Sequence, residues 1–305
     1  MSLQSRQERF AEMASRLPCQ RPNPLIAIAP IEADLFDRLR NAAALYISKS
    51  IPRQTRTLFD EKALLGRIAA SRKEVKNFTP NGMIVAKRHL ILEYNLLVQA
   101  YIHIINSLGI ADFISSWHVP LNLRYKDSEA LEDNMKRHHP TEHTHSDSWA
   151  GESADSITTI IPIFGDVEHN RVDYFAPPPE FEESWLGALP TYAHGAEIAA
   201  KYSRLKVPFL KGFVYLADFS VLHATTRDPG AGARVSIDTT FAMQKAAGDP
   251  EVIHPWRVGE RASHQELLNV GMTRLFVFPD TEDQQVDSQG GFKHPSNLRI
   301  VSILE

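Results

Sequence analysis

The segment GFVYLADFSVLHATTRDPGAGARVSIDTTFAM, residues 212–243, contains two β-like runs separated by a cluster of turn residues. The runs GFVYLA and ARVSIDTTFAM are rich in β-branched and aromatic residues, which favour strands. The sequence DPGAG between them is typical of a turn. If this turn centres on 228–229, an antiparallel hairpin places His223 opposite Arg234, a few ångströms away on the neighbouring strand.

The second run also predicts two chemically different faces, because successive side chains of a strand point to opposite sides. The polar face carries Arg234, Ser236, Asp238 and Thr240, and the other face carries Val235, Ile237 and Phe241. One side of this strand is therefore expected to pack in a core while the other lines a polar interior.

Other short β-rich runs follow the same pattern, with Gly, Pro and Asp between them. They lie at 118–125, 156–164, 171–176, 273–279 and 297–304. The first hundred residues are expected to be mostly helical. Apolar residues recur at helical spacing from Ala33, and further helices are expected at about 60–72, 90–108 and 263–270. We expect one domain, 1–305, that is mainly β with α: a helical flanking region at about 1–115, a β core at about 116–243, and a C-terminal helix and strands at about 244–305.

Composition excludes several classes of protein. The 33 basic and 37 acidic residues leave a net charge of −4 without a basic block, which argues against nucleic-acid binding. No uninterrupted apolar stretch could span a membrane, and the first residues lack the apolar core of a secretory signal. The single cysteine excludes an internal disulfide and fits a reducing compartment. We expect a cytoplasmic protein with a small-molecule substrate, and no pattern predicts its oligomeric state.

The segment TEHTHSDSWAGE, residues 141–152, concentrates histidines beside carboxylates. On a strand, His145 and Asp147 would share a face and could reach one ion. His223 is the expected third ligand, contributed by the hairpin. Two histidines and one carboxylate on a β scaffold form the facial triad that leaves open positions on Fe(II).

Arg234 adds an anion-binding group near this expected metal site. Its planar guanidinium suits a carboxylate through two charge-assisted hydrogen bonds, and Ser236 offers a hydroxyl from the same strand face. Together they suit the far carboxylate of a dicarboxylate cosubstrate.

The combination His145-x-Asp147, a distal His223 and Arg234-x-Ser236 resembles the Fe(II)/2-oxoglutarate-dependent oxygenases. The sequence HSDSWAGE is similar to that of the phytanoyl-hydroxylase-like branch of this family and its streptomycin-biosynthesis dioxygenase-type relatives. The resemblance implies a double-stranded β-helix (jelly-roll, cupin-like) core, with His145, Asp147 and His223 ligating Fe(II). It also implies that Arg234 and Ser236 anchor the C5 carboxylate of 2-oxoglutarate, with O₂ as the oxidant. Halogenases of this family replace the iron carboxylate with a small residue, so Asp147 favours hydroxylation.

Several further residues are expected around the site. Asn122 and Arg124 share a strand face and are candidates for binding cosubstrate or substrate, whereas an exposed strand face is the alternative. Thr158 and Thr159 are weaker candidates. Trp149, Glu152 and Asp238 are candidate substrate contacts, although Trp149 could instead be a packing residue. The polar character of this set favours a small hydrophilic metabolite of the amino-acid or amino-sugar type.

Two other functions stay open. A zinc hydrolase could use His143 as a fourth ligand to activate water, but it leaves Arg234 and Ser236 without a role. A cupin-like sugar-binding protein or isomerase would not need 2-oxoglutarate. Release of succinate distinguishes the oxygenase from both.

Overall fold

The computed structural model describes residues 1–51, 60–71, 79, 82–86, 88–130, 138–244, 260–277 and 299–303. The α-helices are α1 (Leu3–Ala14), α2 (Ala33–Ser50), α3 (Glu61–Ser71), α4 (Ile91–Ser107), α6 (Ala196–Ala199) and α7 (His264–Leu268). Short 3-10 helices are η1 (Arg88–Leu90), η2 (Ala111–Phe113), η3 (Asp147–Ala150), η4 (Glu183–Leu186) and η5 (Tyr192–Gly195). None of the described helices is long and apolar enough to cross a membrane.

Two antiparallel sheets form the β core. The large sheet has the order β1-β2-β8-β5-β10-β3-β11, with β4 also paired to β10, and the small sheet has the order β7-β6-β9. The strands of the large sheet are β1 (Gln20–Asn23), β2 (Ile26–Pro30), β3 (Ile114–Val119), β4 (Asn122–Lys126), β5 (Ser156–Gly165), β8 (Phe213–Asp218), β10 (Arg234–Met243) and β11 (Glu260–Ala262). The small sheet contains β6 (Asn170–Ala176), β7 (Ser203–Arg204) and β9 (Leu222–Arg227), while β12 (Arg274–Val277) and β13 (Arg299–Ser302) pair separately.

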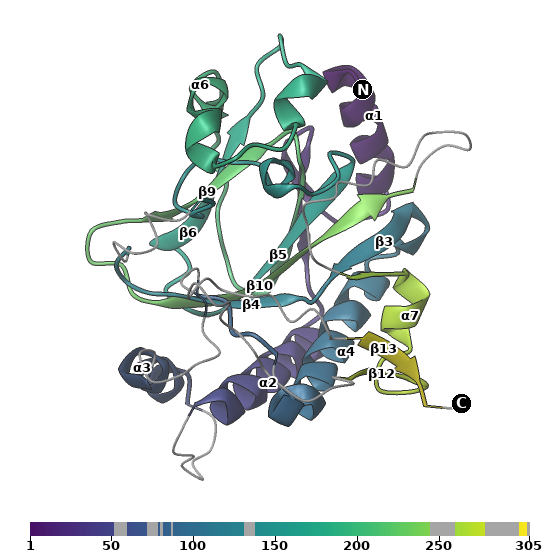
Figure 1. The fold of residues 1–305 in the computed structure, drawn as a ribbon, viewed down its shortest axis with the longest axis vertical. Helices are drawn as coiled ribbons and strands as arrows, with labels where there is room; N and C mark the ends of the chain where they lie inside the picture. The colour runs from purple at the N-terminus through teal and green to yellow at the C-terminus, as the bar shows by residue number, and fades with distance from the viewer. Residues whose placement is uncertain are drawn as a thin grey trace.

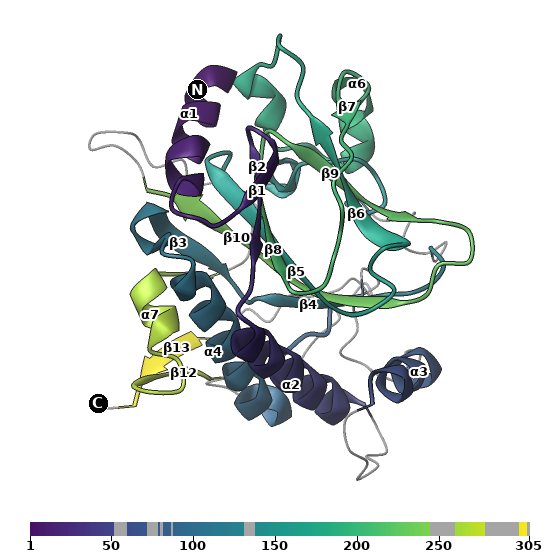
Figure 2. The ribbon, with the colours of Figure 1, turned by 180° about the vertical axis from the view of Figure 1, so that it is seen from behind.

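Helices cover one face of the large sheet, and the small sheet lies on its other side (Figure 1). The view from behind shows the N-terminal strands β1 and β2 extending the sheet beside β8 (Figure 2). This two-sheet jelly roll with flanking helices confirms the predicted fold class. The N-terminal region is less helical than expected, because the buried run Ile26–Ala29 pairs with β8 as a strand.

The helix-facing side of β10 is the apolar side predicted from its alternation. Val235, Ile237 and Phe241 are fully buried in the main hydrophobic core. Phe241 packs on Trp117 of β3, whose ring in turn meets Tyr101 of α4 edge-on. Burying these rings supplies the apolar area that fixes the helices on the sheet.

The predicted helices and strands agree with the structure except near their ends. The helix at about 90–108 is α4, followed by Gly109 at φ 69°, a left-handed conformation that favours glycine at a helix end. The expected strand at 118–125 is divided into β3 and β4. Parts of the predicted elements, at 72, 278–279, 297–298 and 304, lie outside the described residues.

The predicted hairpin between β9 and β10 is wrong. β9 pairs with β6 in the small sheet, and β10 pairs with β5, β4 and β3 in the large sheet. The turn after Arg227 therefore carries the chain from one sheet to the other. Local turn residues predicted the reversal correctly, but the hydrogen-bonding edges of both strands are occupied by other partners.

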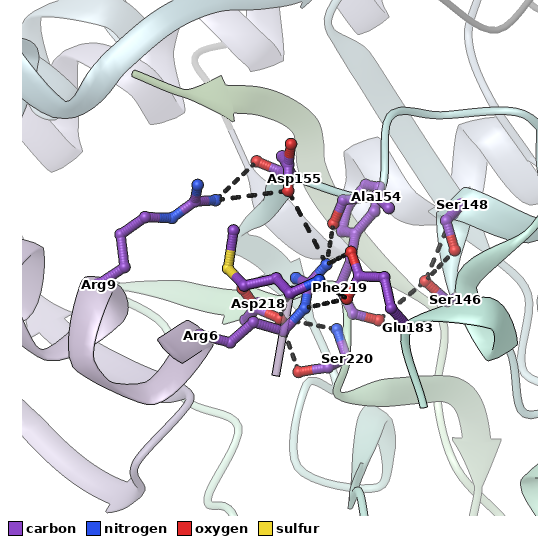
Figure 3. Close-up of polar contacts among 11 residues, drawn as sticks. Arg6, Arg9, Ser146, Ser148, Ala154, Asp155, Glu183, Asp218, Phe219 and Ser220 are labelled. Atoms are coloured by element: carbon purple, nitrogen blue, oxygen red, sulfur yellow. Dashed lines mark hydrogen bonds and ion pairs between the residues drawn. The ribbon is translucent and has the colours of Figure 1, made fainter. Parts of the chain in front are cut away.

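α1 is attached to the β core by Arg6, whose side chain is almost completely buried. Its guanidinium donates to Asp218 at the end of β8 at 2.9 Å, to Glu183 of η4 at 2.8 Å, and to the Ala154 carbonyl at 3.0 Å (Figure 3). Burial alone would lower the pKa of Arg6, but Asp218 and Glu183 hold it above its ordinary value. The charge of Arg6 is therefore neutralised by two carboxylates of the same chain, Asp218 and Glu183.

Removing one partner of a buried ion pair leaves the other charge uncompensated. We expect Arg6→Ala to lower the free energy of unfolding by about 3–5 kcal/mol in urea titrations. The matched control is Arg9→Ala, because Arg9 is more exposed and lies 3.9 Å from Asp155. It should change stability by less than about 1 kcal/mol. Similar small effects from both variants would contradict a structural role for the Arg6 network.

Candidate functional site

A reciprocal pair of backbone hydrogen bonds brings His145 and His223 together. The His145 amide donates to the His223 carbonyl at 3.0 Å, and the His223 amide donates to the His145 carbonyl at 2.8 Å. The segment around His145 therefore adds to the edge of β9 that β6 leaves open. Since directly opposed residues of antiparallel segments share a face, the two imidazole rings lie 4.3 Å apart, centroid to centroid.

Asp147 joins these histidines from a turn, not from the predicted strand. It is the first residue of η3, and the side chain of Ser146 caps this short helix. Asp147 Oδ1 lies 3.9 Å from His145 Nε2, and Asp147 Oδ2 lies 4.0 Å from His223 Nε2. Potential ligand atoms of all three residues lie within 4.8 Å of one another, which is the convergence that a metal site requires.

The protonation of the histidines suits metal binding. His145 Nδ1 donates to the His143 carbonyl at 2.6 Å, which leaves Nε2 directed at the cluster. Burial, followed by the nearby His223, lowers the pKa of His145 to about 3, and burial also lowers the pKa of His223. Both rings are therefore neutral near pH 7, the state in which imidazole is a ligand. A donor set of two neutral imidazoles and a carboxylate fits Fe(II).

Two neighbouring residues hold this cluster in place. Thr158 of β5 donates to Asp147 Oδ2 at 3.3 Å. Thr158, one of the two weaker candidates from the sequence, therefore contacts the cluster. Tyr192 of η5 stacks on His145 at 4.0 Å and 19°. The sequence did not indicate Tyr192, because it belongs to an irregular segment that no periodicity connects to the metal motif. Thr159 points to the helix side instead and bonds Tyr101.

Arg234 extends from β10 into the interior between the sheets and is only 2% exposed. Its guanidinium donates to Asn170 at 3.4 Å, Ser236 at 3.3 Å and Thr225 at 3.5 Å, all long and neutral contacts. Within the described part of the chain, no carboxylate forms an ion pair with Arg234. Burial, followed by Arg227, lowers the pKa of Arg234 to about 10, so it stays charged near pH 7.

Arg234 contacts β9 near His223 although the predicted hairpin is absent. Thr225, which accepts from Arg234, is two residues beyond His223 on β9 and therefore faces the same side. Arg234 is close to the metal cluster because the large sheet, which carries Arg234, faces the small sheet, which carries His223.

Asn122 and Arg124 share one inward face of β4, as predicted. Both are bonded to Asp238 on β10: Arg124 Nε at 2.6 Å and Asn122 Nδ2 at 3.1 Å. Asp238 is thus occupied within the chain, which weakens its case as a substrate acid. Burial lowers the pKa of Arg124, but Asp238 raises it above its ordinary value. Asp147 and Tyr192 raise it further, which indicates that Arg124 lies near the candidate metal cluster.

The remaining substrate candidates have different environments. Trp149 is completely buried in an apolar cluster with Tyr192, and its indole N–H donates to the Trp185 carbonyl at 2.7 Å. This placement favours the packing role over substrate contact. Glu152 is buried beside the site, accepts from Thr240 at 3.1 Å, and lies 3.7 Å from His118 Nδ1.

The chain was compared with protein-family models and with curated proteins, and neither comparison gave a match. Solved structures are similar at low identity. The 2-oxoglutarate-dependent epimerase SnoN from nogalamycin biosynthesis is 12% identical over 78% of this chain and 83% of its own, with a TM-score of 0.43. EctD from S. alaskensis, solved with 2-oxoglutarate and 5-hydroxyectoine, is 15% identical over 87% and 86%, with a TM-score of 0.39.

We expect His145→Ala, Asp147→Ala and His223→Ala each to abolish the weak visible absorption that Fe(II) and 2-oxoglutarate give together under anaerobic conditions. Each change removes one of three converging ligands. Circular dichroism of each variant controls for folding. Retention of the absorption in folded His223→Ala would show that another residue is the distal ligand.

His143 provides a second test, which separates the iron site from a four-ligand zinc site. Among the described residues the converging set contains three members and not His143, whose backbone carbonyl is the group that orients His145. His143→Ala keeps that carbonyl, so Fe(II) affinity in a metal titration should change less than about tenfold. Complete loss of metal, together with tight zinc binding by the parent, would favour the hydrolase.

Proposed function

We propose that residues 1–305 form one oxygenase domain that uses Fe(II), 2-oxoglutarate and O₂ to hydroxylate a small polar metabolite. Two features support this function. His145, Asp147 and His223 provide a three-ligand metal site, and Arg234 provides a buried cationic pocket on the same side of β9. Bound iron would supply the chemistry that couples decarboxylation of 2-oxoglutarate to succinate with oxidation of a substrate.

The observation that carries the proposal is the unbalanced charge of Arg234. A buried charge is costly unless it is paired, and Arg6, which is also deeply buried, has two carboxylates. Arg234 has three neutral partners at long distances. A ligand carboxylate would supply the missing counter-ion, and 2-oxoglutarate carries one at the end opposite its metal-binding 2-oxo acid group.

The surrounding side chains have supporting roles. Ser236 would add a hydroxyl to the carboxylate held by Arg234, and Thr158 keeps the carboxylate of Asp147 oriented. Tyr192 and Trp149 close an apolar cluster beside His145, which keeps water from one side of the metal site. Excluding water strengthens the charge interactions of the interior.

Arg124 and Asn122 are proposed to bind the C1 end of 2-oxoglutarate or the substrate. Their contacts to Asp238 use Arg124 Nε and one amide hydrogen of Asn122. The terminal nitrogens of Arg124 would then be directed by Asp238 as a rigid fork. This role is supported by the electrostatic influence of Asp147 on Arg124.

The substrate is proposed to be of the amino-acid or amino-sugar type. Glu152 is an acidic group beside the metal motif, whereas Asp238 is neutralised by Arg124 and contributes less than its charge suggests. The carboxylate of Asp147 occupies the position that a halogenase leaves for chloride, so hydroxylation is proposed over halogenation.

Succinate release tests the function directly. The iron-loaded protein would be incubated with 2-oxoglutarate and pooled small metabolites, with and without O₂. Succinate formed in proportion to oxidised metabolite, and only with O₂, is the expected result. Turnover without succinate would favour the zinc hydrolase or the cupin isomerase.

The Arg234 pocket predicts a ranked loss of 2-oxoglutarate affinity. Arg234→Ala should be worst, Arg234→Lys intermediate because it loses the two-pronged geometry, and Ser236→Ala mildest because its donor is neutral. A charge-assisted contact contributes about 1.5–3 kcal/mol, or about ten- to a hundred-fold in affinity by calorimetry. Iron binding without cosubstrate should be unaffected in all three.

Arg171→Ala is the matched control for this series, because Arg171 already pairs with Asp173 and Asp228. It should leave the affinity for 2-oxoglutarate unchanged. The pocket assignment fails if Arg234→Ala binds 2-oxoglutarate as tightly as the parent does.

A further inference from the structure

Tyr174 of β6 carries a buried hydroxyl that has no hydrogen-bond partner. The residue is 1% exposed, and its oxygen is among the few buried side-chain atoms of the described residues without a partner. Two other buried tyrosines have partners: Tyr46 donates to a carbonyl, and Tyr215 bonds both a carbonyl and an amide. An unmade buried hydrogen bond costs about 1–3 kcal/mol, so a buried hydroxyl without a partner that faces a candidate ligand site is a candidate for binding the ligand.

The position of Tyr174 directs it toward the interior between the sheets. It lies directly opposite His223 in the β6–β9 register, and opposed residues of antiparallel strands share a face. Tyr174 therefore faces the same side as the distal metal ligand. Thr225, on the same face of β9, is the residue that Arg234 reaches from the large sheet.

A series of ring contacts leads from Tyr174 to Arg234. Tyr174 stacks on Tyr215 at 6.4 Å and 12°, and Tyr215 packs on Phe209 at 4.9 Å. The guanidinium carbon of Arg234 lies 5.3 Å from the centroid of the Phe209 ring. Ring contacts thus connect Tyr174 to the guanidinium of Arg234, and each of the two residues influences the pKa of the other.

We propose that the Tyr174 hydroxyl binds the distal carboxylate of the cosubstrate, as a donor additional to Arg234 and Ser236. This inference rests on the proposed function and adds a residue to it. A carboxylate has acceptor sites for several donors at once, so one ligand carboxylate could accept from the Tyr174 hydroxyl and form an ion pair with Arg234. Burial raises the pKa of Tyr174, so its proton is retained and available for donation near pH 7.

The test compares two acids that differ in the distal carboxylate. Calorimetric titrations of anaerobic Fe(II)-loaded parent and Tyr174→Phe would use 2-oxoglutarate and 2-oxobutanoate, which lacks that carboxylate. Tyr174→Phe should weaken 2-oxoglutarate about tenfold, the loss expected for one hydrogen bond to a charged group. Its affinity for 2-oxobutanoate should be that of the parent.

Tyr202→Phe is the matched control, because Tyr202 has another buried hydroxyl without a partner but lies in the apolar cluster around Trp149. It should leave both affinities unchanged. Metal-free Tyr174→Phe supplies a readout independent of the loaded protein: its free energy of unfolding should equal or exceed that of the parent. A purely structural hydroxyl would instead make the variant less stable.

Three results would overturn the inference. Unchanged 2-oxoglutarate affinity in Tyr174→Phe would exclude the contact while leaving the proposed function intact. An equal loss for both acids would indicate a packing defect and not a contact to the distal carboxylate. Failure of the parent itself to bind 2-oxoglutarate would overturn the proposed function together with this inference.

Discussion

The reciprocal backbone hydrogen bonds between His145 and His223 are the constraint on which the site depends. They place two residues far apart in the sequence directly opposite each other, at the edge of the small sheet. Once the two backbones are paired, both imidazoles share a face, and the turn at Asp147 brings the carboxylate to the same point. The three candidate metal ligands are thus positioned by backbone geometry.

The Ser146 and Asp218 contacts connect this site to the N-terminal helix. Ser146, between the two ligands, donates to the Phe219 carbonyl at 2.9 Å. The preceding residue, Asp218, accepts from Arg6 and also from the amide and hydroxyl of Ser220 (Figure 3). His223 follows the turn at Asp218–Ser220 by three residues. The contact of Arg6 with Asp218 therefore attaches α1 to the segment that leads to His223. The residues before the β core therefore contribute to the site without touching it.

Two buried arginines, Arg6 and Arg234, differ in the partners of their charge. Arg6 is neutralised within the chain and joins α1, η4 and β8. Arg234 has comparable burial, but its hydrogen-bond partners are neutral, which is why we propose that it binds the carboxylate of a ligand. The cost of burying a charge is met by carboxylates of the chain at Arg6, and on this proposal it would be met by a ligand at Arg234.

Alternation along the sequence determined much that is local: the strand extents, the two faces of β10, and the residue types that form the metal and anion sites. Asp147, Arg234 and Ser236 were candidates from the sequence because their residue types and order resemble those of an oxygenase family. Tertiary structure decided the partners. β9 and β10 belong to different sheets, Asp238 is bonded to Arg124, and Tyr192 reaches His145 from an irregular segment without a diagnostic pattern. The physical reason is that periodicity specifies which way a side chain points, whereas a backbone edge can pair with any strand that packing brings beside it.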